Sequence, residues 1–315
     1  MEVIRKLPIL AASCLLALGA SAQSSRTPEV TPGKPGVEPF GIVTGSVTVV
    51  SPKSDVAPAG YAHTNYKIFV PATHPGPFTT PDSNGEWPGS LGCVYGVSTA
   101  YTGCVPGANL DKPKGGWGAI ALVDAYHDHT AAADLAAFDT FFGLATAKFT
   151  QVEANSSFGT LGGLTASCSG KPASAAGTGW ALEESLDIEW AHVMAPSAQI
   201  ILVEACSNSY NDLIYAEYVA GQEVAKYGGG DVSISWGGGE SSNEVNYDPA
   251  FRATNKNVTY FASAGDSAGA IEYPATGARL AVRCAPATAI GAARRCRRTR
   301  LFYVGGSNLG NNQLW

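Results

Sequence analysis

The sequence predicts an α/β fold, a doubly wound and mostly parallel sheet with helices on both faces. Between residues 117 and 264, short apolar runs alternate with segments of helical periodicity. Apolar strands separated by helices are typical of a parallel sheet that is covered on both sides. Hydrophobic residues make up 45% of the 315-residue chain and charged residues only 15%, against roughly 25% in an average soluble domain. The chain can therefore bury a large core.

The elements follow from these runs in chain order. We expect strands at 119–123, 148–152, 199–205, 231–236 and 258–264, and helices at 134–144, about 181–194, and about 211–227. Reactive groups of doubly wound sheets lie beyond the carboxyl ends of the strands. The polar or aromatic residues at those ends, namely Asp124, Trp236 and Asp266, are therefore candidates for a site.

The N-terminal region divides into two parts. Arg5 and Lys6 precede an apolar run that ends in the small-residue sequence Ala20-Ser21-Ala22, which predicts a signal peptide over 1–22 and a secreted, extracellular protein. A membrane anchor is the alternative, but the run is shorter than the roughly 20 residues that a bilayer needs. Residues 23–115 are rich in Pro and Gly and are interpreted as a linker or short pro-like region, before a domain over 116–315.

The net charge and the cysteines limit the classes of binding partner, disulfide and metal site that the chain can have. The net charge of −6 provides no basic surplus for nucleic acid, and no membrane association is expected after signal cleavage. The six cysteines that remain allow 15 pairings. Cys93 and Cys104 flank a short Gly-containing loop and form the favoured disulfide candidate. We expect no zinc site, since no C-x-x-C spacing occurs.

One predicted helix carries a pair of carboxylates. Glu183 and Asp187 are four residues apart, which places them on one helix face. Like charges this close disfavour joint ionisation, so one carboxyl tends to keep its proton while the other acts as a base. An ordinary solvated helix face is the competing interpretation. His127 and His129, after the first strand, are interpreted as exposed loop histidines rather than metal ligands.

In combination, these segments resemble the sedolisins, the serine-carboxyl peptidases with a subtilisin-like fold. The matching stretches are AIALVDAY at 119–126, LEESLDIEWAHVMAP at 182–196, IILVEACSNS at 200–209, VSISWGG at 232–238 and FASAGDS at 261–267. The resemblance implies that Glu183 is the general base, Asp187 its partner and Asp266 the acid of the oxyanion hole. It also implies that Asp124 and Trp236 are outer members of the carboxyl network, and that the substrate is a protein or peptide cleaved at acidic pH.

The chain also departs from the family. Sedolisins carry the nucleophile in a Gly-Thr-Ser motif, followed by a calcium loop, and neither occurs before Trp315. The resemblance therefore implies a C-terminally truncated member with no identified nucleophile and no cofactor or metal in this chain. A non-catalytic product or secreted binding module on the same scaffold is the alternative function. Ser267, in a G-x-S-x-G match, leaves an esterase as a third interpretation.

Residues 279–300 form an anomalous Arg-rich segment. They hold seven of the ten arginines of the chain and no acidic residue. A local reading-frame shift in the gene and a genuine basic loop both account for this composition, and the sequence leaves the two open.

Overall fold

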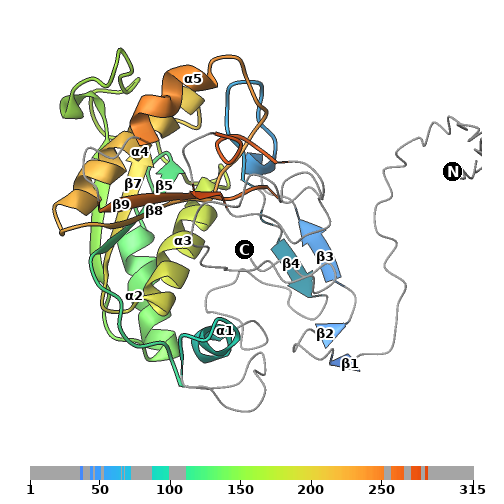
Figure 1. Ribbon diagram of the computed structural model, residues 1–315. Helices are drawn as coiled ribbons and strands as arrows, with labels where there is room; N and C mark the ends of the chain where they lie inside the picture. Colours follow the sequence, from blue (N-terminus) through green and yellow to red (C-terminus); the bar gives the residue numbers. More distant parts are fainter. Residues whose placement is uncertain are drawn as a thin grey trace, which may run out of the picture. The chain divides into compact units, whose positions relative to one another are not determined.

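The computed structural model contains a parallel sheet that is flanked by helices (Figure 1). The structure describes residues 36–37, 43–44, 47–50, 53–64, 66, 68–71, 87–98, 111–251, 257–265, 271–277 and 281–282. The sheet has six strands in the order β10-β9-β8-β5-β7-β6, and every neighbouring pair is parallel. Its strands are β5 (Ala119–Ala125), β6 (Lys148–Ala154), β7 (Gln199–Ala205), β8 (Gly230–Ile234), β9 (Val258–Ala262) and β10 (Ala281–Val282). The predicted α/β class is confirmed.

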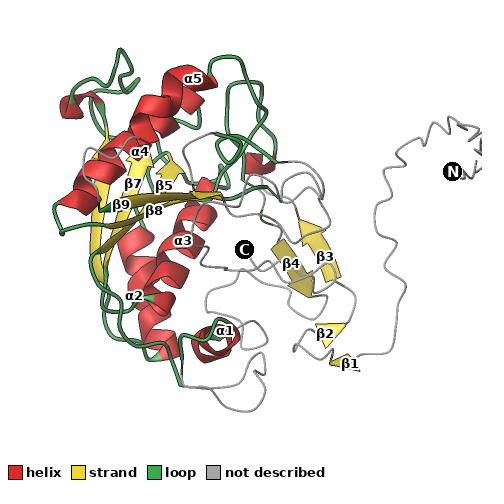
Figure 2. Ribbon diagram, in the orientation of Figure 1, coloured by secondary structure: helices red, strands yellow, loops and turns green. Residues whose placement is uncertain are grey.

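Helices cover both faces of the sheet, as Figure 2 shows. The longer ones are α2 (Ala131–Phe142), α3 (Trp180–Met194) and α4 (Tyr210–Ala225). Alternate strand residues point to opposite faces. Val123 and Val203 therefore pack with Leu213 of α4, whereas Leu122 and Leu202 belong to the cluster of α2 and α3. Burial on both faces explains why these strands read as continuous apolar runs.

Helix ends follow local sequence signals. Gly143 ends α2 with a φ of 60°, a left-handed conformation that glycine adopts at little cost. Ser209 caps α4, because its side chain accepts a hydrogen bond from the backbone N–H of Asp212. The helix expected at 134–144 in fact begins at Ala131, and the strand expected to reach Trp236 ends at Ile234.

Smaller elements lie outside the central sheet. They are β1 (Gly36–Val37), β2 (Val43–Thr44), β3 (Val47–Val50), β4 (Ile68–Pro71), α1 (Pro88–Val94), α5 (Glu244–Tyr247) and the 3-10 turns Lys53–Asp55, Ser156–Phe158 and Asp248–Phe251. β1 pairs antiparallel with β2, and β3 pairs antiparallel with β4.

Part of the expected linker is built into the domain. The backbone N–H of Ala62 donates to the carbonyl of Asn208 at 2.8 Å, and His63 pairs antiparallel with Gly237. Ala62 and Thr64 are fully buried. The backbone of this segment completes hydrogen bonds of the loops that follow β7 and β8, and the interpretation of 23–115 as a linker or short pro-like region stays a prediction. The boundary at residue 116 stays a prediction.

Other predictions, on the two ends of the chain, concern residues outside the described ranges. The expected signal peptide at 1–22 lies outside them, as does the Arg-rich segment apart from β10. Within the described ranges, no helix combines the length and apolar character needed to cross a membrane.

Candidate active site

Helix α3 places the two predicted carboxylates inside the protein. Glu183 and Asp187 each have only 5% of their surface exposed. The helix begins after Gly179, whose φ of 102° sets the chain direction, and the Thr178 hydroxyl accepts a hydrogen bond from the backbone N–H of Trp180. The solvated-face interpretation is therefore wrong, because this helix face packs against the protein.

Asp187 is tied to the end of a central strand. The Ser235 hydroxyl donates a hydrogen bond of 2.8 Å to Oδ1 of Asp187. Ser235 follows β8 directly, so the bond joins α3 to the carboxyl end of the sheet. A donor at this distance orients the carboxylate.

Asp124 lies near the carboxyl end of β5, which is an inner strand of the sheet, and is fully buried. It lies opposite Glu204 in the register of β5 and β7. Burial raises the pKa of Asp124 well above its usual value, and the nearby charges of Asp187 and Glu204 raise it further. Neither carboxyl oxygen of Asp124 has a hydrogen-bond partner among the residues described. Such a carboxyl holds a proton, because an uncompensated buried charge is costly.

Two further buried carboxyls were not predicted from the sequence. Glu184 is fully buried, and burial together with the neighbouring carboxyls of Asp124 and Glu204 raises its pKa to about 11. Glu204 is also fully buried, and burial raises its pKa while hydrogen bonds from His127 and Gln151 oppose the shift. A charged residue inside the apolar run QIILVEA is the signal that could have indicated Glu204.

Trp236 is the remaining predicted member of the carboxyl network that the structure describes. Trp236 is fully buried and stacks on Tyr210, with ring centroids 6.4 Å apart. Its indole N–H has no hydrogen-bond partner in the described part of the chain, so its place in the carboxyl network stays a prediction.

Tyr66 lies close to Glu183. Burial is the main cause that raises the pKa of Tyr66 to about 12, and the charge of Glu183 contributes to the same shift.

Other predicted residues lie outside the described ranges. These are Asp266, Ser267 and Cys104. Cys93 is disulfide-bonded, but its pairing with Cys104 stays a prediction. A disulfide that the sequence did not single out joins Cys168 to Cys206. Across the described ranges, no group of three or more His, Cys, Asp or Glu side chains is arranged to hold a metal ion.

The comparisons with known proteins are sparse. No protein-family model and no curated protein matches the sequence. Among solved structures, the chain is similar to Pseudomonas sedolisin, a serine-carboxyl proteinase complexed with two molecules of pseudo-iodotyrostatin, with 18% sequence identity and a TM-score of 0.47. The match covers 63% of this chain and 53% of that chain, so the chain spans about half the length of the solved structure that it resembles.

Proposed function

We propose that this chain carries the acid–base half of a serine-type endopeptidase that cleaves proteins or peptides at acidic pH. The observation that carries the proposal is the burial of Glu183 and Asp187 on one face of α3, beside the carboxyl end of the sheet. Two carboxyls one turn apart in a poorly hydrated site can share a proton. The motif resemblance, taken in order along the chain, supports the same assignment.

Each residue would have a distinct part in acyl transfer. Glu183 takes the proton of an attacking hydroxyl, and Asp187, oriented by Ser235, accepts part of the charge that Glu183 gains. Asp266 would donate a hydrogen bond to the developing oxyanion, which requires its protonated form. Asp124 would stay neutral beside Asp187 and so would not compete for the shared proton.

Acidic pH follows from this division of roles. A carboxyl can donate to an oxyanion only while protonated, and a carboxylate can act as a base only while charged. Both conditions are met together below neutrality. We also propose that residues 1–22 direct secretion, which would deliver the protein to a compartment where Cys168–Cys206 persists.

The test is hydrolysis of a denatured protein between about pH 3 and 6, the range in which coupled carboxyls titrate. Two forms are assayed, the 315-residue chain and the product of the coding sequence read beyond codon 315. We expect cleavage by the form that supplies a Gly-Thr-Ser segment, abolished by Glu183→Gln and retained by Glu240→Gln, a change at an exposed carboxylate. Cleavage that survives both Glu183→Gln and Asp187→Asn would refute the assignment. A complete lack of cleavage by both forms would favour a binding module.

A further inference from the structure

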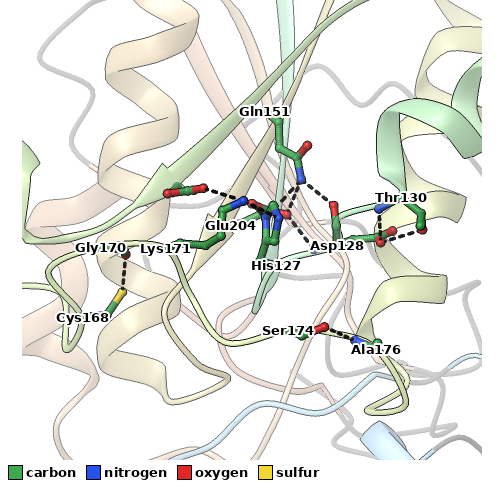
Figure 3. A network of polar contacts seen from close by, with 11 residues as sticks. His127, Asp128, Thr130, Gln151, Cys168, Gly170, Lys171, Ser174, Ala176 and Glu204 are labelled. Atoms are coloured by element: carbon green, nitrogen blue, oxygen red, sulfur yellow. Dashed lines mark hydrogen bonds and ion pairs between the residues drawn. The ribbon is translucent and has the colours of Figure 1, made fainter.

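A second polar cluster lies in the loop after β5 and is separate from the α3 pair (Figure 3). Its centre is His127, which is 8% exposed and not the exposed histidine that the sequence suggested. The cluster borders an open groove of about 530 Å³ whose lining includes His127, Gln151, Glu153, Lys171 and Lys226. The α3 pair does not line this groove.

The contacts fix the protonation of the imidazole. Nζ of Lys171 lies 2.9 Å from Nε2 of His127. An ammonium group can only donate, so Nε2 must accept and the ring proton must be on Nδ1. Nδ1 lies 2.7 Å from Oε2 of Glu204, which is a carboxylate acceptor. The arrangement therefore holds His127 in its neutral form.

The other groups around the ring agree with this tautomer. The side-chain amide nitrogen of Gln151 donates to Oε1 of Glu204 at 2.6 Å and to the carbonyl of Asp128 at 2.7 Å. Both of its protons are then used, and Nδ1 of His127 is left to donate to Glu204.

The backbone of His127 also forms hydrogen bonds with the segment that carries Lys171. The backbone N–H of His127 donates to the carbonyl of Ala173, and the N–H of Ala175 donates to the carbonyl of His127, both at 2.8 Å. This segment runs directly into Gly179 and α3. Its earlier part is held separately, by the Cys168–Cys206 disulfide and by hydrogen bonds from Ser167 to Asp212.

We propose that His127 and Lys171 form a pH-dependent switch that holds residues 169–176 against β5 near neutrality and loosens them in acid. A second proton on the imidazole would occupy Nε2 and face the ammonium of Lys171 at 2.9 Å, so the contact cannot survive protonation. Imidazole is the side-chain group that most commonly changes its charge between about pH 5 and 8, a range in which a secreted protein can encounter acid.

The surrounding charges favour release of Lys171 rather than movement of the ring. Glu204 from β7 would hold the imidazolium through its contact with Nδ1, and Glu184 from α3 lies close enough to Glu204 and Asp128 to interact with both. Glu153 from β6 is the anion available to the released ammonium, since its Oε1 lies 3.5 Å from Nζ of Lys171. The lysine side chain is 58% exposed and can turn without repacking the core. The switch does not depend on the proposed peptidase activity.

The test is amide hydrogen exchange in the full chain at pH 7.5 and pH 5.0, expressed as protection factors that remove the intrinsic effect of pH. For residues 170–176 we expect about a tenfold fall in protection at pH 5.0, the scale of one lost hydrogen bond to a charged group. Lys171→Met should lower protection already at pH 7.5 and leave it nearly unchanged at pH 5.0. Lys226→Met, at the other lysine of the groove, should behave like the wild type.

Three results would overturn the switch. The first is equal protection of residues 170–176 at both pH values in the wild type. The second is a tenfold fall that persists in Lys171→Met. The third is an equal loss of protection across β7, which would indicate a global change rather than a local release.

Discussion

The two faces of the central sheet are built from the same strands but differ in chemistry. On the α4 face, Val123 and Val203 pack with Leu213 in an apolar cluster. On the α3 face, Leu122 and Leu202 pack in the same way, but the next residues on that face, Asp124 and Glu204, are carboxyls. A shift of two positions along a strand thus changes an aliphatic core into a buried acidic cluster.

This difference indicates what each face contributes. Aliphatic burial stabilises the fold at any pH, by about 25 cal/mol per Å² of apolar surface removed from water. Buried carboxyls oppose folding whenever the solution would ionise them. Buried ionisable groups of this kind cluster at functional sites. We therefore propose that the functional site lies at the acidic end of the α3 face. Glu217 on α4, fully buried with a pKa raised chiefly by burial, is an exception on the apolar side.

The largest expected effect is on catalysis at the α3 face. In an active form of the enzyme, Glu183→Gln and Asp187→Asn should each lower peptide hydrolysis by about 10²- to 10⁴-fold, as expected for general acid–base groups. Thermal unfolding should change little, since each substitution keeps the size of the side chain. The measurement is kcat/KM with far-UV circular dichroism on the same samples. Near wild-type turnover in both variants would remove the functional contrast between the faces.

The next effect concerns the apolar face. Leu213→Ala should cost about 2–5 kcal/mol of unfolding free energy, because Leu213 is fully buried against β5 and β7 and its removal leaves a cavity. The loss should be the same at pH 4 and pH 7 in urea denaturation. Leu182→Ala, at a leucine that is 42% exposed on α3, is the matched control and should cost well under half as much. A strongly pH-dependent cost at Leu213 would show that the faces are not separable.

The effect of Glu184→Gln on the free energy of unfolding should depend on pH. Its folded pKa of about 11 is above that of the unfolded chain, so the folded state binds the extra proton. The group's favourable contribution is therefore complete below about pH 4 and is lost as the pH rises toward the folded value. Glu184→Gln should leave stability unchanged at pH 3.5 and raise it at pH 7, by at most about 3 kcal/mol. Glu240→Gln should do neither. A destabilised Glu184→Gln variant at pH 7 would indicate that Glu184 is charged and paired.

The smallest expected effect is at Ser235. Ser235→Ala removes the hydrogen bond to Asp187, which is worth about 1 kcal/mol, so activity should fall by about five- to tenfold. A hydrogen bond to a carboxylate generally stabilises the charged form, so if Asp187 acts as the charged partner of Glu183, the acid limb of the pH–rate profile should move to higher pH. Ser233→Ala, two residues earlier in β8, should leave the profile in place. A lower rate with an unchanged pH–rate profile would indicate that Ser235 has only a structural role.

The sequence predicted the sheet well because its signals are local. Continuous apolar runs and helical periodicity located the core strands and α2 to α4 to within a few residues, and the i,i+4 spacing identified Glu183 and Asp187. Contacts between distant segments were not predictable in this way. The pairing of His63 with Gly237, the Cys168–Cys206 disulfide and the approach of Lys171 to His127 each depend on how loops fold back. The burial of Glu184 was not predicted, because helix periodicity gives the direction of a side chain but not the depth of the neighbouring layer.

The central claim is that the α3 face holds the buried carboxyl of Asp124 in its protonated form, and a titration of Asp124 tests it most directly. The measurement is a carbon-13 NMR titration of the side-chain carboxyls, with the Asp124 signal assigned by its loss in Asp124→Asn. We expect the Asp124 signal to keep the chemical shift of a neutral carboxyl at pH 6, because burial and the charges of Asp187 and Glu204 raise its pKa. A signal that titrates near pH 4, like an exposed aspartate, would contradict the account.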